Sequence, residues 1–229
     1  MAVPINRVYN TVLNILNKEQ RGFITPDEFN TIANQAQIEI FEKYFYDQNR
    51  FELTNRMSAG DYNDLMRNIE EKITFFDETS TLQASSPGFF QYPANFYRLG
   101  IVSVGGVFAD EVSHKDILYI ERGPLTASTS KQPKYTRHEG GISLYPTTTA
   151  TINMVYVREP STPNWVGGIV NSNIVPVTTD TNYQDFELHS SEEPELVAKI
   201  LAYSGVLVRD QEAAQAGAIA SQSIKQDEA

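Results

Sequence analysis

The longest amphipathic pattern of the chain runs from Thr25 to Arg50. Apolar side chains recur there at steps of three and four residues, which places them on one face of a helix. They are Phe29, Ile32, Ala33, Ala36, Ile40, Phe41, Tyr44 and Phe45. The start is clear as well, because Thr25, Pro26 and Glu28 have the order of a capping box with Pro in the first turn. A helix of about 25 residues is roughly 37 Å long, so a substantial partner must cover its stripe.

Two more helices are predicted in the first part of the chain. One runs from about Pro4 to Gln20 and is stopped at Gly22. The other is capped by Asp61 and carries apolar residues at helical steps up to Phe76. We therefore assign residues 1–78 to the N-terminal helices of a bundle.

Between residues 79 and 188 the helical period disappears, and Ser, Thr, Gly, Pro, Val and Tyr dominate, which is typical of β structure. The predicted strands are 90–92, 97–104, 134–138, 142–145 and 151–158. Glu139, Gly140 and Gly141 lie between the third and fourth of them and are expected to supply the positive-φ residues of a tight hairpin. Ser113 is expected to cap a short helix, and residues 161–182 are interpreted as irregular or edge structure.

Helical periodicity returns near the end of the chain. A helix capped by Ser190 or Ser191 carries acidic residues in its first turn and continues to about Val208. A weakly amphipathic helix is predicted over 210–226. We expect residues 189–229 to complete the helical bundle and to contact neighbours. The predicted fold class is therefore α+β, a helical bundle with residues 79–188 as a β-sandwich-like insertion.

Composition changes this picture by excluding two classes of protein. The 18 Lys and Arg stand against 29 Asp and Glu, a formal net charge of −11, which opposes tight binding to a phosphate backbone. The hydrophobic fraction of 41%, with 12 Tyr and 12 Phe, is too high for a disordered acidic chain. The sequence has no Cys, no signal sequence at its start, and no apolar run near the roughly 18 residues that span a bilayer. We expect a soluble protein made in the cytoplasm.

One segment has the spacing of a calcium-binding loop of the EF-hand kind. It is Asn17 to Glu28, with Gly at the sixth position and Glu at the twelfth. Arg21 puts a guanidinium where a ligand oxygen is required, and the first position is a neutral Asn. The capping box explains the same residues, so no metal site is predicted, but a calcium-responsive helical adaptor stays as an alternative function.

Catalytic signatures are missing from the sequence. His114, His138 and His189 are far apart and show no spacing of metal ligands. The pairs Glu70-Glu71 and Glu192-Glu193 are adjacent residues, which do not face each other on a helix. Nucleophile-elbow, dinucleotide and P-loop motifs are absent. We predict a protein without enzymatic activity, metal or cofactor.

The segment after the last predicted strand combines two prolines with the only Trp of the chain. The strand ends in Arg158, Pro160 and Pro163 stiffen the backbone beyond it, and Trp165 is the only Trp of the chain. Trp165 could cover the bottom of the β core, or it could be a rigid aromatic anchor at an interface, where Trp and Arg are over-represented. The spacing leaves both interpretations open.

Three segments carry a resemblance to a known family. They are ITPDEFNTIANQAQIEIFEKYFYDQNR, YVREPSTPNW and ELHSSEEPELVAKILAYSGVLVRDQEAAQAG. The chain, from near Asn6 to near Gly217, resembles the head-to-tail ring proteins of short-tailed bacteriophages, the adaptor or tail tubular proteins of crAss-like phages and other podoviruses. The resemblance implies a virion protein of the phage neck, assembled in the host bacterial cytoplasm as a ring of about a dozen copies below the portal.

The partners implied are sister copies, the portal protein and another neck or tail ring protein, with no membrane. DNA passes through such a ring without specific binding, and we expect an acidic lumen to repel its phosphates. The candidate interface residues are Arg158, Pro160, Pro163, Trp165, Glu195, Tyr203 and Arg209. A carbohydrate-binding tail or capsid accessory protein, which uses exposed Tyr and Trp of the β region, remains a further alternative.

Overall fold

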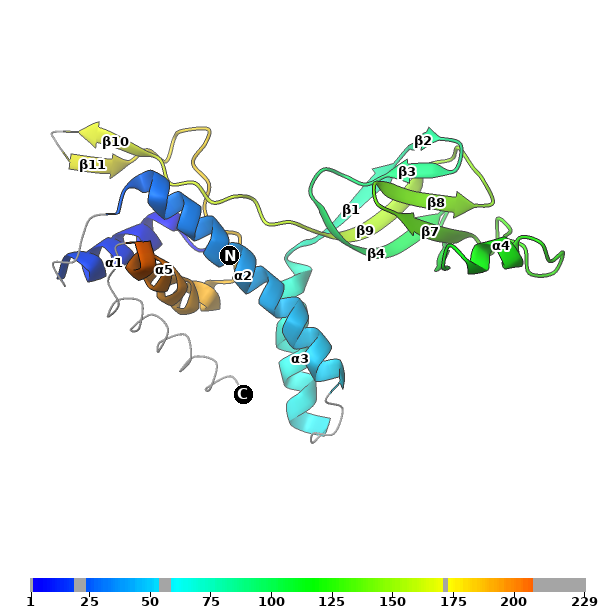
Figure 1. The fold of residues 1–229 in the computed structure, drawn as a ribbon, viewed down its shortest axis with the longest axis horizontal. Coiled ribbons are helices and arrows are strands. Elements are labelled where there is room, and N and C mark those ends of the chain that lie inside the picture. The colour runs from blue at the N-terminus through cyan, green and yellow to red at the C-terminus, as the bar shows by residue number, and fades with distance from the viewer. Residues whose placement is uncertain (1, 19–23, 54–58, 171–172, 208–229) are drawn as a thin grey trace. The chain divides into compact units, whose positions relative to one another are not determined.

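The computed structural model describes residues 2–18, 24–53, 59–170 and 173–207. The fold is α+β, with helices toward both ends of this part of the chain and strands between them (Figure 1). Contacts divide the chain into two units. The helical unit comprises Met1–Lys72 and Pro160–Ala229, and the β unit comprises Ile73–Glu159. The β unit therefore interrupts the helical unit in sequence.

The principal helices lie where the apolar periodicity predicts them. They are α1 (Ile5–Lys18), α2 (Pro26–Leu53), α3 (Ala59–Thr74) and α5 (Glu193–Leu207). The capping box of α2 is confirmed, because the Thr25 amide donates to Glu28 Oε2 at 2.8 Å and the Glu28 amide donates to Thr25 Oγ1 at 3.3 Å. Hydrogen bonds from Thr25, the backbone one first, lower the pKa of Glu28.

Two predicted helix starts differ from the structure. Helix α3 begins at Ala59, so Asp61 lies inside the helix and is not its cap. Helix α5 is preceded by a 3-10 turn, η1 (Ser190–Glu192), in which His189 Nδ1 accepts from the Ser191 amide at 3.3 Å. His189 therefore takes the capping role that the sequence assigned to Ser190 or Ser191. The helix predicted over 210–226 lies outside the described residues.

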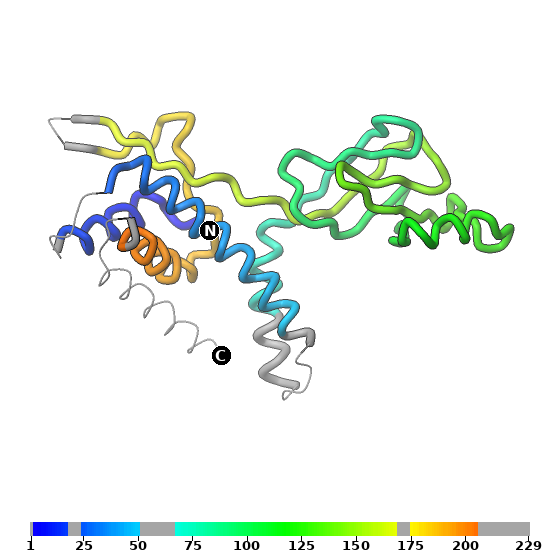
Figure 2. Tube along the Cα trace, viewed as in Figure 1, coloured from blue at the N-terminus to red at the C-terminus, as the bar shows by residue number. Residues whose placement is uncertain are grey.

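The helical unit packs around the apolar stripe of α2. Helix α5 lies against both α2 and α1, and Figure 2 shows the orange α5 beside the blue α1. The expectation that the C-terminal helix packs on N-terminal ones is thereby confirmed for α1 and α2. The stripe itself is buried, and so are apolar residues of other parts of the helical unit, among them Val8, Val12, Phe186, Leu188, Leu196 and Ile200.

The β unit holds two sheets that share one core. One sheet has the order β1 (Asp77–Leu82), β9 (Ile152–Arg158), β4 (Phe96–Val104), β5 (Val107–Phe108). The other has the order β2 (Ala84–Ser86), β3 (Phe89–Gln91), β8 (Gly141–Tyr145), β7 (Lys134–His138), β6 (Asp110–Glu111). Both sheets contribute to the cluster of Phe90, Leu99, Val102, Tyr135, Ile142, Leu144, Ile152, Met154 and Tyr156. All five predicted strands are present, whereas β1, β2, β5 and β6 were not predicted.

The β7–β8 hairpin is present, but Gly141 is required there for another reason than the positive φ that was predicted. The last ladder pair is His138 with Gly141, so two residues form the turn. Positive φ occurs among the described glycines at Gly88, Gly105 and Gly106, not in this turn. A Cβ at Gly141 would lie 2.1 Å from the carbonyl oxygen of Phe90 on β3. Glycine is required there because a neighbouring strand approaches closely.

The end of the insertion also differs from the prediction, since residues 160–188 belong to the helical unit and not to the β unit. The segment includes a hairpin of β10 (Gly167–Val170) and β11 (Asn173–Pro176). The buried Gln37 of α2 holds it at both ends. Its Nε2 donates to the Ser161 carbonyl at 2.8 Å, and its Oε1 accepts from the Glu187 amide at 3.0 Å.

Candidate functional site

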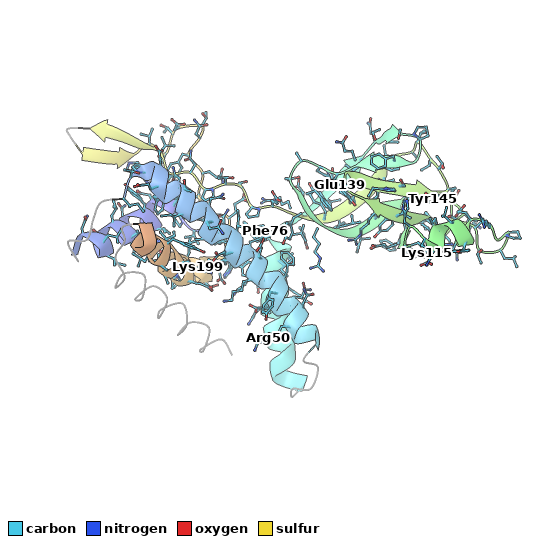
Figure 3. All side chains as sticks on the ribbon, viewed as in Figure 1. Arg50, Phe76, Lys115, Glu139, Tyr145 and Lys199 are labelled. Atoms are coloured by element: carbon cyan, nitrogen blue, oxygen red, sulfur yellow. The ribbon has the colours of Figure 1, made fainter. Side chains whose placement is uncertain are left out.

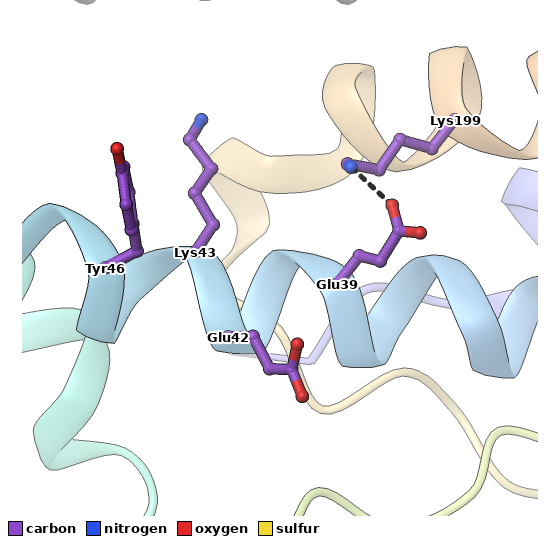
Figure 4. A pocket seen from close by; sticks show the side chains of 5 residues that line it. All are labelled: Glu39, Glu42, Lys43, Tyr46 and Lys199. Carbon is purple, nitrogen blue, oxygen red and sulfur yellow. Dashed lines mark hydrogen bonds and ion pairs between the residues drawn. The ribbon is translucent and has the colours of Figure 1, made fainter.

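Charged side chains of α2 and α5 meet along a seam that borders an open depression of about 400 Å³. Glu39, Glu42, Lys43, Tyr46 and Lys199 line the depression (Figure 4). Lys199 of α5 points toward Glu39 of α2, and its Nζ donates to Glu39 Oε2 at 2.8 Å. The depression is therefore a polar surface feature with part of its charge already neutralised by ion pairs.

Tyr203 and Glu39 have strongly interacting ionisable groups. The Tyr203 hydroxyl donates to Glu39 Oε1. Burial, followed by the neighbouring carboxylate, raises the pKa of Tyr203 to about 12. Burial acts to raise the pKa of Glu39, but the hydrogen bonds from Lys199 and Tyr203 outweigh it, so this pKa is lowered. Neither group is poised near neutral pH, where a general acid or base is most effective.

Two further ion pairs extend the seam into the interior. Lys43 Nζ lies 2.9 Å from Glu195 Oε2, and Lys72 Nζ lies 2.5 Å from Glu192 Oε1. Both glutamates are only 4% exposed. Buried carboxylates are tolerated in proteins when they are paired, so these contacts tie α2 to the first turn of α5 and α3 to η1. The seam fixes the helices and brings together two predicted interface residues, Glu195 and Tyr203.

Trp165 lies in the helical unit, not beneath the β core. Its side chain is 2% exposed and stacks on Tyr9, with ring centroids 4.1 Å apart. Its Nε1 donates to Asn6 Oδ1 at 3.2 Å, and its amide donates to Asn30 Oδ1 at 2.8 Å. Pro163 is also buried. Trp165 therefore packs within the chain, and its contacts attach the segment after the β unit to α1 and α2.

The remaining candidate residues are dispersed. Arg158, at the end of β9, lies with its Nε 3.9 Å from Glu78 Oε2 and with its guanidinium over the Phe76 ring at 5.9 Å. Pro160 is half-buried. Arg209 lies outside the described residues. Among the six candidates that the structure describes, Glu195 and Tyr203 both bind residues of α2, and Pro163 and Trp165 are both buried in the helical unit.

The described residues offer little to a metal ion. The rings of His114 and His138 meet edge to face, 4.7 Å apart, but no group of three or more His, Cys, Asp or Glu in the described part of the chain is arranged to hold a metal. In the calcium-loop segment, Glu28 Oε2 accepts from both the amide and the hydroxyl of Thr25. The carboxylate that would be the twelfth ligand is thus occupied by the helix cap.

A surface that the sequence analysis missed lies on the β unit. It comprises α4 (Asp116–Ile120) and the residues on either side, from 113 to 134, where β7 begins, and we call it the α4 tip. Leu118, Tyr119 and Leu125 are 65%, 66% and 98% exposed. The signal was present in the sequence, because Ile117 to Ile120 are four apolar residues in succession within a five-residue helix. A short helix buries one face only, and here Ile117 takes it.

In Figure 1, α4 and the loop after it project beyond the two sheets of the β unit. Figure 3 marks Lys115 at the start of this element. Ser113 Oγ accepts from the Asp116 amide at 3.2 Å, as predicted, but α4 begins at Asp116 and its N-cap position is Lys115, which makes no side-chain capping bond. The tip is therefore an outward-facing element with a defined start.

No family model matches the chain, and no curated protein matches it. Among the helices of the described residues, none combines the length and apolar character needed to cross a bilayer.

Proposed function

We propose that this chain is a structural virion protein that forms a ring in the neck of a short-tailed phage and connects the portal to the tail. The observation that carries the proposal is the separation of charge between the two units. The β unit has seven Lys and Arg against eight Asp and Glu, a net charge of −1. The helical unit has eleven against twenty-one, a net charge of −10.

A ring multiplies this separation, because every copy presents the same face to the axis. Helical units around the axis make an acidic lumen that repels the phosphates of DNA. The genome then slides past the wall without being held by it. The near-neutral β units are free to make the contacts between copies and with neighbouring rings.

The resemblance to head-to-tail ring proteins supports the same assignment through the order of elements. The proposed architecture is a helical bundle interrupted by a β-sandwich-like insertion. The partners of the ring are sister copies, in a number of about a dozen, the portal protein and a second neck or tail ring protein. Its place is the virion neck, after assembly in the host bacterial cytoplasm.

The proposal includes no catalytic role and no cofactor. It is supported by the α2–α5 seam, where the ionisable groups of Glu39 and Tyr203 have pKa values driven away from neutrality. Such a seam holds the two helices together and leaves neither group ready for proton transfer at neutral pH.

Negative-stain imaging of the purified chain, alone and mixed with the portal protein of its own virion, tests the proposal. We expect closed rings that stack coaxially on the portal. A chain that stays monomeric in both samples, up to the concentrations of a virion assembly reaction, contradicts it.

A further inference from the structure

The α4 tip is held in shape by its own hydrogen bonds. Thr126 Oγ1 donates to the Ile120 carbonyl at 2.9 Å, and the Ser128 amide donates to Glu121 Oε1 at 2.9 Å. Lys134 Nζ on β7 donates to the Thr126 carbonyl at 2.7 Å. A Cβ at Gly123 would lie 2.3 Å from Thr126 Oγ1, so a larger residue there would displace the Thr126 hydroxyl from its hydrogen bond to the Ile120 carbonyl. These hydrogen bonds fix the conformation of the loop, in which Leu125 is exposed.

Apolar side chains that are exposed to water in a monomer lose the stabilisation that burial would give them. Leu125 is 98% exposed, and Leu118 and Tyr119 are about two-thirds exposed within the same element. Apolar residues scattered singly over a surface need no explanation, but three strongly exposed ones within eight residues of one projecting segment favour an interaction site. The tip thus has the apolar anchors that a partner surface would cover.

The charge of the tip is opposite to that of the chain. It has four Lys and Arg against two Asp and Glu, a net charge of +2 in a chain of −11. Both acidic side chains are engaged locally, Asp116 by Ser113 and Glu121 by Ser128. Lys115, Arg122 and Lys131 are exposed. The apolar anchors are therefore surrounded by cations directed toward solvent.

We infer that the α4 tip docks on the acidic helical unit of a second copy of this chain. The charges of +2 and −10 are complementary, which steers encounter and fixes the register of the contact, while burial of Leu118, Tyr119 and Leu125 supplies the affinity. Different surfaces of the two copies meet, so the contact is heterologous and repeats head to tail until a ring closes. The inference rests on the proposed ring and names the surface that builds it.

The same chemistry occurs in loops that bind anionic lipid or DNA, but the rest of the molecule opposes both. Outside the tip the chain has a net charge of −13, with fourteen Lys and Arg against twenty-seven Asp and Glu. A phosphate surface is large and repels this charge, whereas a protein partner meets the tip alone. The helical unit of a sister copy is the acidic surface available in a homo-oligomer.

Photo-crosslinking from position 125 tests the inference on the full chain. A benzophenone amino acid replaces Leu125 in one isotopically heavy copy, which is mixed with light wild-type copies. We expect heavy-to-light crosslinks to peptides of Met1–Lys72 or Pro160–Ala229. The inference is overturned if the crosslinks fall in the β unit or stay within one copy. It is also overturned if no crosslink forms in an assembled mixture.

Two variants add a quantitative test. Leu125→Asp and Arg122→Glu should each weaken self-association by about tenfold or more in sedimentation velocity. Ile101→Thr is the matched control, because Ile101 is 54% exposed on the same unit but lies on β4, away from the tip segment. Equal affinities for all three variants contradict the inference. Near-ultraviolet circular dichroism verifies that each variant is folded.

The outcomes separate this inference from the proposed function. Rings that form normally in Leu125→Asp leave the neck-ring proposal standing and overturn the docking of the tip. A wild-type chain that forms no oligomer alone or with the portal overturns both. Flotation with phosphatidylglycerol vesicles and a mobility shift with duplex DNA complete the set. If the wild type binds vesicles or DNA and Leu125→Asp does not, the tip binds that surface and not a sister copy, and the inference is overturned.

Discussion

Replacement of Trp165 by Ala separates the two roles that the sequence left open for this residue. If Trp165 is an internal support, its loss destabilises the isolated chain. If it is an interface anchor, its loss weakens assembly and leaves the isolated chain intact. The contacts with Tyr9, Asn6 and Asn30 predict the first result.

The magnitude is set by the burial of the indole. A buried aromatic side chain removes about 150–250 Å² from water, and at about 25 cal/mol per Å² this gives roughly 4–6 kcal/mol. The Ala methyl keeps part of this burial, and large-to-small aromatic substitutions cost about 3–5 kcal/mol. We expect Trp165→Ala to lower the free energy of unfolding of the helical unit by about 4 kcal/mol, a large part of the roughly 5–15 kcal/mol of an ordinary domain.

Denaturation in urea, monitored by far-ultraviolet circular dichroism, measures this loss under conditions where the chain is monomeric. Trp165→Phe is the matched variant, because Phe keeps a ring against Tyr9 and removes the hydrogen bond to Asn6. It should cost about 1–2 kcal/mol. In the wild type, Trp165 is the only Trp, so its emission reports the unfolding of its own surroundings.

One result refutes this reasoning directly. A Trp165→Ala chain with the urea midpoint and slope of the wild type, but with self-association lost, would place the indole at an interface. The buried conformation described here would then not be the one that matters for assembly.

The other predictions concern the helix cap and the seam. Thr25→Ala should lower the free energy of unfolding by about 1 kcal/mol through loss of the capping box, and an unchanged thermal midpoint would contradict this. Glu192→Gln should cost about 1–3 kcal/mol in chemical denaturation because it breaks the buried pair with Lys72, and a stabilised variant would refute that role. The pKa of Tyr203 is raised from 10.0 to about 12, so its contribution to stability is present below pH 10 and lost as the pH rises to 12. Tyr203→Phe should flatten the decline of the thermal midpoint between pH 10 and pH 12, and an equally steep decline in the variant would contradict this. The pKa of Glu39 is lowered from 4.5, so its contribution to stability is present above that pH and lost on further acidification. Glu39→Gln should make acid unfolding less steep below pH 4.5, and an equally steep acid transition in the variant would contradict this.

Local chemistry explains why much of the fold could be predicted. The capping box at Thr25 and Glu28 and the apolar stripe behind it determined α2, because each depends on residues at most four positions apart. The five predicted strands of the β unit follow from local composition, because the residue types that favour β structure replace the helical period there. Strand β1 was missed, since Asp77–Leu82 is mostly polar and exposed and is recruited by pairing with β9.

Contacts between distant segments account for the features that could not be predicted. The burial of Trp165 depends on Tyr9 and Asn6, more than 150 residues earlier in the chain, and no spacing near position 165 encodes it. The end of the β insertion at Glu159 depends likewise on Gln37, which binds residues 161 and 187.

The α4 tip is a different case. Its four consecutive apolar residues, 117–120, were legible in the sequence as more than a five-residue helix can bury. The predicted interface residues lie elsewhere and are engaged within the chain: Trp165 is buried, and Glu195 and Arg158 are in ion pairs.

Cryo-electron microscopy of the chain assembled on its portal tests the central claim most directly. The account predicts a closed ring with the helical units, and their surplus of carboxylates, around the lumen, and with each α4 tip seated on a neighbouring copy. A lumen lined mainly by Lys and Arg, or a chain that attaches to the portal as single copies without lateral contact, would contradict it.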